Sequence, residues 1–189
     1  MRLSSVLRTS LVVVSATLTV PASAELVTNG GFETGDFTGW TVENAPVGSS
    51  LVVYNDSTPF GSHYASFAAN GGAYDSISQL LATSAGQEYS ISFWVNNFGV
   101  ENDSLLIDWE GVTVQNLTPL GTELESWTQI TFNVTALSDG SLFRIRGFDA
   151  QSAIALDAIS VTQVPAPGAA AVLAALPLLG NGRRRRRAN

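Results

Sequence analysis

Two acidic side chains, Asp108 and Glu110, form the pair in this sequence whose spacing best suits acid–base chemistry. In an extended strand, residues two apart point to the same side and lie roughly 7 Å apart. Glycoside hydrolases place two carboxylates about 5–9.5 Å apart across a cleft. The chain has 16 acidic residues, however, and so acidic a chain produces such pairs by chance. A solvated strand face is the favoured interpretation, with a small glycoside hydrolase as an alternative.

Other forms of catalysis find less support. The chain has no cysteine, which excludes disulfides, thiolate zinc sites and a cysteine nucleophile. His63 is its one histidine, so a single chain cannot build a multi-histidine metal site. No serine lies in a Gly-x-Ser-x-Gly elbow, and no lysine follows the double glycines, as a phosphate-binding loop requires. We therefore expect a protein that is not an enzyme.

Charge is unevenly distributed along the chain. All nine basic residues are arginines, and only Arg144 and Arg146 lie between Glu25 and Asp157, the segment that holds all 16 acids. The net charge of that segment is −14. Nucleic acids are not expected as partners, because their phosphates need a basic face. Cations and neutral ligands suit such a body better.

Residues 1–24 have the layout of a secretory signal peptide. Arg2 and Arg8 provide a positive start, and an apolar run follows over 11–20. Pro21 then breaks the helix, and the small residues that signal peptidase requires follow at 22–24. We expect an N-terminal signal helix and cleavage by signal peptidase after Ala24. A buried first helix of the domain is the alternative, but no charged face makes the segment amphipathic.

The C-terminal segment, residues 165–189, has the opposite layout. A proline motif is followed by an apolar run over 169–179 and five arginines at 183–187. The run is shorter than the ~20 residues of a stable membrane span, but arginines held inside can halt translocation. A short hydrophobic helix that serves as a transient inner-membrane anchor is therefore expected. A basic nucleic-acid-binding tail is the alternative, which the acidic body disfavours.

This tail resembles the PEP-CTERM sorting signal of Gram-negative bacteria, which joins a proline motif, a hydrophobic helix and an arginine cluster. Ala166 stands where many members have glutamate. The resemblance implies that an exosortase removes the tail from an inner-membrane intermediate, and that the protein then reaches the cell surface or extracellular matrix. The residues that match the signal are Val164, Pro165, Ala166, Pro167, Arg183, Arg184, Arg185, Arg186 and Arg187.

The body, residues 25–164, is expected to be all-β. Short runs rich in β-branched and aromatic residues recur between Gly, Asn, Asp and Pro turns, at 39–43, 49–54, 64–68, 74–83, 89–98, 105–110, 112–117, 127–135, 142–148 and 154–163. Ten short strands in about 140 residues predict a two-sheet antiparallel jelly-roll sandwich.

Alternation within the strands assigns their two sides. The expected inward residues are Tyr89, Ile91, Phe93, Val95, Thr128, Ile130, Phe132, Val134, Phe143 and Ile145. Saccharide rings stack on exposed aromatic rings, and polar groups read their hydroxyls. If their strands are neighbours, one outward patch suited to sugar contains Trp94, Asn96, Asp108, Arg144 and Arg146. Alternatively, the arginines pair with acids such as Asp108 and a loop partly covers Trp94. Trp40, Trp109 and Trp127 are expected in the core.

Two motifs at the ends of the body resemble the galactose-binding-like jelly rolls, which include many carbohydrate-binding modules. The first runs Asn29-Gly30-Gly31-Phe32-Glu33 and continues to Trp40, and the last is Leu156-Asp157-Ala158-Ile159. The resemblance implies a structural Ca²⁺ held by Glu33 and Asp157, with carbonyls of the Asn29–Gly31 turn and of residues 61–63. Oxygen ligands suit Ca²⁺, which takes about 6–8 of them. Alternatively, Glu33 and Asp157 cap turns.

The sequence as a whole predicts an exported, non-catalytic jelly-roll protein of the cell surface or extracellular matrix, which binds Ca²⁺ and extracellular polysaccharide. A structural or adhesive matrix protein without a defined ligand is the first alternative, and a small glycoside hydrolase is the second.

Overall fold

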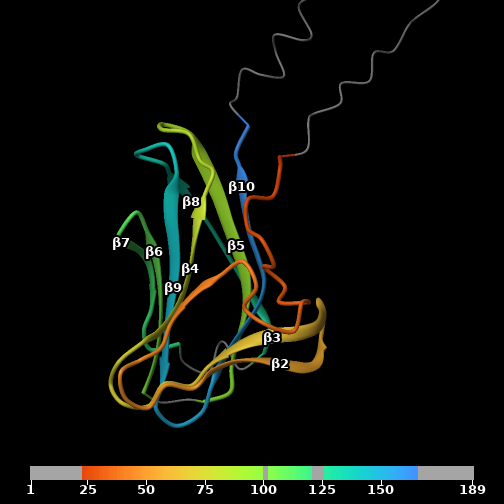
Figure 1. The fold of residues 1–189 in the computed structure, drawn as a ribbon, viewed down its shortest axis with the longest axis vertical. Coiled ribbons are helices and arrows are strands. Elements are labelled where there is room, and N and C mark those ends of the chain that lie inside the picture. The colour runs from red at the N-terminus through yellow and green to blue at the C-terminus, as the bar shows by residue number, and fades with distance from the viewer. Residues whose placement is uncertain (1–22, 100–101, 121–125, 166–189) are drawn as a thin grey trace, which may run out of the picture. The chain divides into compact units, whose positions relative to one another are not determined.

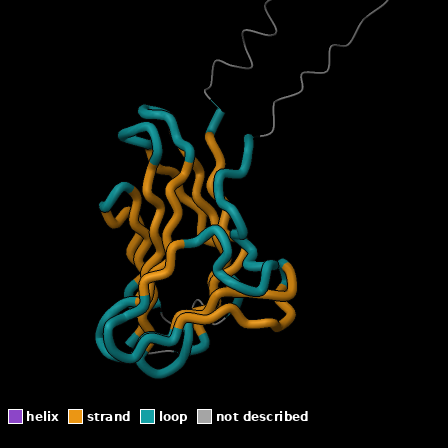
Figure 2. The backbone as a smooth tube through the Cα atoms, viewed as in Figure 1, coloured by secondary structure: helices purple, strands orange, loops and turns teal. Residues whose placement is uncertain are grey.

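The computed structural model describes residues 23–99, 102–120 and 126–165. The predicted signal helix, the hydrophobic C-terminal helix and most of the sorting motif lie outside these residues. Within the described part, no helix is long and apolar enough to cross a membrane. The described chain is built from strands and loops (Figure 2).

Two five-stranded antiparallel sheets form the fold, which confirms the predicted jelly-roll sandwich (Figure 1). One sheet has the order β1-β4-β9-β6-β7 and the other has the order β2-β3-β10-β5-β8. The strands are β1 Thr41–Glu43, β2 Leu51–Thr58, β3 Gly61–Phe67, β4 Asp75–Leu81, β5 Glu88–Asn97, β6 Asp103–Trp109, β7 Val112–Leu117, β8 Thr128–Thr135, β9 Ser141–Asp149 and β10 Ile154–Gln163.

The first and last segments of the body lie side by side. Glu25 forms an isolated antiparallel bridge with Thr162, and the Leu26 amide donates to the Val161 carbonyl over 3.0 Å. Pairing of chain ends in this way brings the loop that follows Leu26 against β10. The N-terminal motif and the closing motif therefore meet in space.

The core lies between the two sheets, and the predicted alternation is confirmed. Tyr89, Ile91, Phe93 and Val95 of β5 are all buried, and the residues that alternate with them, Ser90, Ser92 and Trp94, are half-buried. In β9, Phe143 and Ile145 are buried as well. Since apolar side chains from both sheets meet here, their burial provides the main drive for folding.

The tryptophans divide between core and surface. Trp40 and Trp109 are buried as predicted, at 8% and 3% exposure. Trp127 is only half-buried, so its assignment to the core was wrong. The reason is its phase: Trp127 lies one residue before the inward series that starts at Thr128, and it therefore points to the opposite side of the sheet.

The β2–β3 hairpin is longer than predicted. The sequence predicts that this strand ends at residue 54 and that a turn follows over 55–59, but β2 continues to Thr58, and its register with β3 shifts between Asn55 and Thr58. β3 begins at Gly61 and not at Tyr64. The reason is tertiary, because the far end of the hairpin is bonded to the N-terminal loop and to β10, and a local pattern does not report such contacts.

Candidate functional site

Aromatic side chains gather on the outer side of the sheet β2-β3-β10-β5-β8. Trp94 alternates with the buried Phe93 and Val95, so it points away from the core. Its neighbours in register are Asp157 of β10 and Gln129 of β8. The group, called here the outer aromatic face, consists of Tyr54, Phe60, Tyr64, Trp94, Phe98 and Trp127.

The rings of the outer aromatic face contact one another in an unbroken series. Phe60 and Trp94 have centroids 4.4 Å apart, and Phe60 meets Trp127 edge-on at 6.1 Å. Tyr64 lies 6.0 Å from Trp127 and 5.6 Å from Tyr54, and Phe98 ends the series 6.4 Å from Tyr64. Such pairs contribute about 0.5–1.5 kcal/mol each beyond their area burial. The rings therefore hold one another in position.

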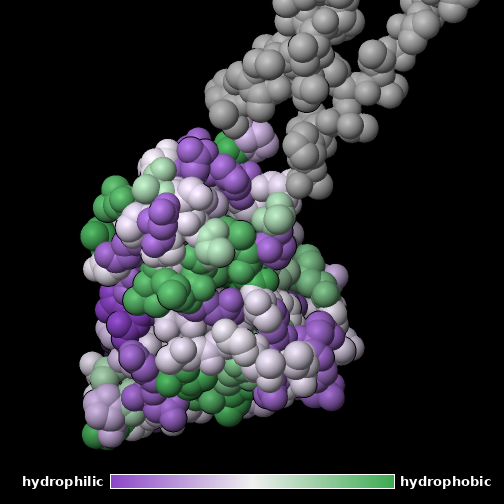
Figure 3. Space-filling model, turned by 45° about the horizontal axis from the view of Figure 1, so that its top comes forward, coloured by the Kyte–Doolittle hydropathy of each residue, from purple (hydrophilic) through white to green (hydrophobic). Residues whose placement is uncertain are grey.

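Several of these rings remain open to solvent. Tyr54 is 50% exposed, Phe98 53% and Phe60 36%. Single exposed apolar side chains, such as Leu80 at 75%, are ordinary in folded proteins. In the view of Figure 3, hydrophobic patches are separated by polar residues. Direct ring-to-ring contact distinguishes the outer aromatic face from scattered exposure, and contiguous exposed apolar groups, unlike single ones, call for an explanation.

Polar groups lie among the rings. Asn96 shares the outward side with Trp94, yet it is only 9% exposed, and its buried Oδ1 has no hydrogen-bond partner in the part of the chain that the structure describes. Burial raises the pKa of the Tyr64 phenol above its usual value, and the nearby Asp56 and Tyr54 raise it further. Tyr64 therefore keeps its proton at neutral pH and can donate a hydrogen bond.

The five residues predicted to form one sugar patch lie in different sheets. Trp94 and Asn96 belong to β5, whereas Asp108, Arg144 and Arg146 belong to β6 and β9 of the other sheet. The outward sides of the two sheets face opposite directions. The outward residues of β5 therefore cannot form one patch with those of β6 and β9. The single patch is therefore wrong, and only Trp94 and Asn96 remain on the aromatic side.

The arginines pair with acids, which confirms the alternative interpretation. Arg146 donates to Asp108 through Nε at 2.7 Å and through a terminal nitrogen at 2.9 Å. Arg144 donates to Glu43 at 2.6 Å. The first pair is the more enclosed, with side-chain exposures of 26% and 10% against 37% and 61%. Exposed pairs contribute little to stability, so the Arg146–Asp108 pair is the more important of the two.

Asp108 and Glu110, the pair considered for hydrolysis, both accept hydrogen bonds from their surroundings. Burial raises the pKa of Asp108, but hydrogen bonds and positive charge from Arg146, with Thr113, lower it by more. Glu110 accepts from the Leu137 and Ser138 amides and from the Ser141 hydroxyl. Burial raises its pKa as well, and these donors again lower it by more. A general acid needs a raised pKa, which neither residue has.

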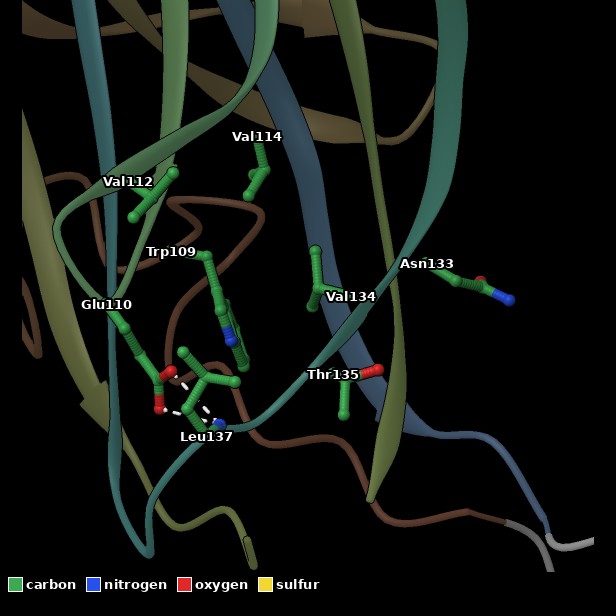
Figure 4. A pocket seen from close by; sticks show the side chains of 8 residues that line it. All are labelled: Trp109, Glu110, Val112, Val114, Asn133, Val134, Thr135 and Leu137. Carbon is green, nitrogen blue, oxygen red and sulfur yellow. Dashed lines mark hydrogen bonds between the residues drawn. The ribbon is translucent and has the colours of Figure 1, made fainter. Parts of the chain in front are cut away.

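A hollow of about 380 Å³ opens between the edge strands β7 and β8 (Figure 4). Its walls include Trp109, Val112, Val114 and Leu137, and Glu110 closes one end by bonding the Leu137 amide. The hydrolase alternative requires a cleft that holds Asp108 and a second acid. This hollow is lined by Glu110 and not by Asp108, so it lacks that pair.

Glu33 is bonded to the start of β3. Its Oε1 accepts from the amides of Ser62 at 2.9 Å and His63 at 3.1 Å, and its Oε2 accepts from the Ser62 hydroxyl at 2.9 Å. The Ser62 amide and hydroxyl are the main causes of a lowered pKa for Glu33. Residues 61–63 thus meet Glu33 through N–H and hydroxyl donors. The resemblance had implied carbonyls from these residues.

Asp157 lies at a bulge of β10, where the register with β5 shifts before Ser160. It is fully buried, and its carboxylate accepts from the Thr58 hydroxyl and the Ala158 amide, both at 2.6 Å. Burial raises its pKa, and the negative charge of Glu33 raises it further. Within the described residues, no arginine or histidine bonds to this carboxylate, so its charge is not balanced by a side chain.

Asn29 holds the N-terminal loop together. Its Nδ2 donates to the Thr34 hydroxyl and to the carbonyls of Asp36 and Thr38, at 2.8 to 3.1 Å, and its own carbonyl accepts from the Trp40 indole. Its positive φ of 54° places this residue in the left-handed region, which Asn tolerates. The Asn29 side chain therefore organises the loop that carries Glu33.

Asp157 and Glu33 approach each other beside Gly31. Gly31 lies between the two acids, since a methyl group added there would stand 3.6 Å from Asp157 Oδ1 and 3.8 Å from Glu33 Cγ. No group of three or more His, Cys, Asp or Glu residues in the described ranges is placed so that it could hold a metal ion. A cation here would need two carboxylates supplemented by hydroxyl and backbone oxygens. Ca²⁺ accepts such a set, whereas zinc prefers nitrogen and sulfur.

Sequence reasoning missed most of the outer aromatic face. Tyr54, Phe60, Tyr64 and Phe98 were not singled out, and Trp127 was placed in the core. The signal for Trp127 was present, because it is out of phase with the inward residues of its strand. Phe60 had no local signal, since it lies in the turn between β2 and β3 and reaches Trp94 only through the fold.

Solved carbohydrate-binding modules share this fold. The CBM22-1 xylan-binding domain of Xyn10C from Paenibacillus barcinonensis matches 78% of this chain and 99% of its own, with a TM-score of 0.55 and 20% identity. TmCBM61, solved with β-1,4-galactotriose, matches 75% of this chain and 100% of its own, with a TM-score of 0.54 and 18% identity. At these identities the likeness shows a common jelly-roll fold. No family model and no curated protein matches the sequence.

The same fold occurs inside larger proteins. The enzymatically active domain of tailspike protein 4 from bacteriophage CBA120 matches 74% of this chain, with a TM-score of 0.58 and 15% identity. This chain spans about a fifth of that protein, as the match covers 21% of the tailspike chain. The fold is thus compatible with a separate binding module and with a part of an enzyme chain.

The Arg146–Asp108 pair generates a stability prediction. Asp108→Asn should lower the free energy of unfolding at pH 7 by about 1–3 kcal/mol, because it leaves a half-buried guanidinium without its charged partner. Since the folded-state pKa of Asp108 is lowered, the ionised group stabilises the fold above its unfolded pKa, and this stabilisation disappears as the pH falls through the folded value.

Denaturant unfolding between pH 7 and pH 3 measures the difference in the free energy of unfolding between the wild type and Asp108→Asn. This difference should stay constant down to about pH 5 and shrink below about pH 4. Glu43→Gln, which breaks the exposed pair with Arg144, is the matched control and should cost less than about 1 kcal/mol. An equal loss in both variants, or a difference that does not change with pH, would contradict the structural role of Asp108.

Proposed function

We propose that this protein is a non-catalytic carbohydrate-binding protein that holds a polysaccharide on its outer aromatic face. The observation that carries the proposal is the unbroken series of six rings, three of which are at least a third exposed. The apolar C–H faces of pyranose rings pack on such aromatic surfaces. Rings fixed by mutual contact lose little entropy when a ligand binds.

The polar groups of this face suit sugar hydroxyls. The hydroxyl of Tyr64 supplies a hydrogen-bond donor. Gln129 lies beside Trp94 in register and is exposed. A few placed polar groups on an aromatic surface give orientation and specificity to a binding site. The body is strongly acidic, which favours a neutral glycan over an anionic one.

The comparisons support this proposal through fold and through the ligands of the similar proteins. The xylan-binding domain and the galactotriose-bound module share the jelly roll with this chain. The first of these binds xylan, and the second was solved with β-1,4-galactotriose. A role without catalysis agrees with the lowered pKa values of Asp108 and Glu110.

The sugar-binding proposal predicts which rings matter. Tyr54→Ala and Phe98→Ala should each weaken binding to a neutral polysaccharide about tenfold or more, because stacking on an aromatic side chain is lost. Both side chains are about half exposed, so their removal should leave the fold intact. Titration calorimetry with xylo-, gluco-, manno- and galacto-oligosaccharides measures the change.

Tyr74→Ala provides the matched control. Tyr74 contacts Phe148 and lies under Arg146, away from the outer aromatic face, so its removal should leave sugar affinity unchanged. Equal affinity in all three variants would place binding elsewhere on the protein. Absence of heat with every sugar in the wild type would favour a structural matrix protein without a defined glycan.

We further propose that Glu33 and Asp157 hold a structural Ca²⁺. The two acids converge at Gly31, and the charge of Asp157 has no balancing side chain within the described residues. A bound cation would offset the repulsion that raises the pKa of Asp157. It would also fix the N-terminal loop against β10 and the β2–β3 hairpin.

Asp157→Asn tests this metal site. In chelator, the variant should be as stable as the wild type or more stable at pH 7, because a buried charge with a raised pKa destabilises the fold once the pH exceeds that pKa. In excess Ca²⁺, the wild type should gain several degrees in melting temperature, and Asp157→Asn should gain less. Asp56→Asn, which removes an exposed acid of the same hairpin, is the control and should gain as much in melting temperature as the wild type. An equal gain in Asp157→Asn and Asp56→Asn would contradict the site.

Export and sorting remain proposals that the sequence supports. We infer that the chain is exported by a Gram-negative bacterium and released from an inner-membrane intermediate after exosortase removes the tail. The three-part layout of residues 164–189 supports this inference. Mass spectrometry of the surface-exposed protein should find an N-terminus at Glu25. It should also show that the C-terminal tail, which ends at Asn189, has been removed. Glutamine at all five positions 183–187 should leave the tail attached. A mature wild type that still ends at Asn189 would contradict sorting.

A further inference from the structure

Three polar side chains occupy one end of the interior, where the alternation predicts apolar residues. Asn97 continues the inward series of β5, Asp103 that of β6 and Asp149 that of β9. Their exposures are 1%, 3% and 1%. Buried carboxylates are rare unless they are paired or bind a metal.

The two acids lie directly across from each other. Asp103 and Asp149 are register partners in the antiparallel β6–β9 pair, and such partners have Cβ atoms about 4.5–5.5 Å apart on the same face. Like charges in this arrangement repel. Asn97, from the other sheet, donates its amide to Asp103 over 2.6 Å and so connects the two sheets.

The hydrogen bonds leave one carboxylate oxygen unbonded. Asp149 Oδ1 accepts from the amides of Gln151 and Ser152, whereas Asp149 Oδ2 is buried and has no hydrogen-bond partner among the described residues. By contrast, Asp75, an equally buried acid, accepts three hydrogen bonds over both of its oxygens. The unpaired oxygen is therefore particular to Asp149 and not a general property of buried acids in this fold.

No basic side chain of the described residues balances these charges. The chain has no lysine, and the two described arginines are bonded to Glu43 and Asp108 on the outward side of the sheet. Uncompensated burial of carboxylates costs several kcal/mol per ion. The arrangement calls for a cation from solution.

We propose that Asp103, Asp149 and Asn97 form a second cation site, separate from Glu33 and Asp157, that takes Ca²⁺. Its side-chain donors are carboxylate and amide oxygens, which suit Ca²⁺ and not zinc or copper. The two carboxylates neutralise a divalent ion, and Asp149 Oδ2 is its natural ligand. Gly99 lies close by, since a methyl group added there would stand 3.2 Å from that oxygen.

The location gives this site a structural role. The connections from β5 to β6 and from β9 to β10 are among those that pass from one sheet to the other at this end. They are joined by the Phe98 amide to the Ala153 carbonyl at 3.0 Å and by the Ala150 amide to the Asn102 carbonyl at 3.3 Å. A cation bound by Asp103 and Asp149 ties this end of the sandwich together.

Calcium stoichiometry of the full chain tests the proposal. After removal of metal with a chelator and titration with Ca²⁺ alone, native mass spectrometry should find two ions on the wild type and one on Asp157→Asn. Asp149→Asn should also bind one ion, and the double variant none. Asp75→Asn, with an equally buried carboxylate removed, should keep two ions even if its melting temperature falls.

Two results would overturn the second site. One is retention of the wild-type stoichiometry by Asp149→Asn, which would make Asp149 a buried acid without a metal. The other is loss of all calcium in Asp157→Asn, a result that does not depend on whether Asp149→Asn folds. Neither measurement involves sugar, so failure here is distinct from failure of the carbohydrate-binding proposal.

Discussion

The hydrogen bond between the buried carboxylate of Asp157 and the hydroxyl of Thr58 is the contact on which the rest of the candidate site depends. Asp157 lies at the bulge of the last strand, and Thr58 ends β2, about a hundred residues earlier in the chain. Glu33 bonds the other side of the same hairpin through Ser62 and His63. One pair of acids therefore anchors the hairpin at both strands and joins it to the N-terminal loop. A cation between them would reinforce all three segments.

The position of Phe60 follows from these anchors. It lies in the turn between Thr58 and Ser62, so the two acids determine where its ring goes. The ring meets Trp94, which is itself the register partner of Asp157. The metal site and the sugar face that we propose are thus two sides of one arrangement. Alternation alone places Tyr54 of β2, Tyr64 of β3 and Trp94 of β5 on the outer side of the sheet, whereas the position of Phe60 in the hairpin turn needs the tertiary contact.

Much of this arrangement could be predicted from the sequence, and the exceptions have physical causes. Alternation predicted the strands and the core, and the two end motifs predicted that Glu33 and Asp157 approach each other. Strand order was not predictable, because alternation reports the face of a residue and not its sheet. Arg146 and Trp94 were for this reason placed together although they lie on opposite sides of the sandwich. Phe60 and the length of its hairpin depend on contacts between distant segments, which no local pattern contains. Asp149 was overlooked because the predicted strand ends at residue 148, whereas β9 continues to Asp149. Only the longer strand places Asp149 in the inward series of Phe143 and Ile145.

The four tryptophans provide the most direct test of where carbohydrate binds. Each indole N–H gives one signal in a nitrogen–proton correlation spectrum, and the four are distributed between the core, at Trp40 and Trp109, and the outer aromatic face, at Trp94 and Trp127. Titration of the labelled chain with a soluble neutral oligosaccharide that binds should shift the signals of Trp94 and Trp127 and leave those of Trp40 and Trp109 in place. Binding that moves neither Trp94 nor Trp127, or that shifts Trp109 at the edge hollow instead, would contradict the account.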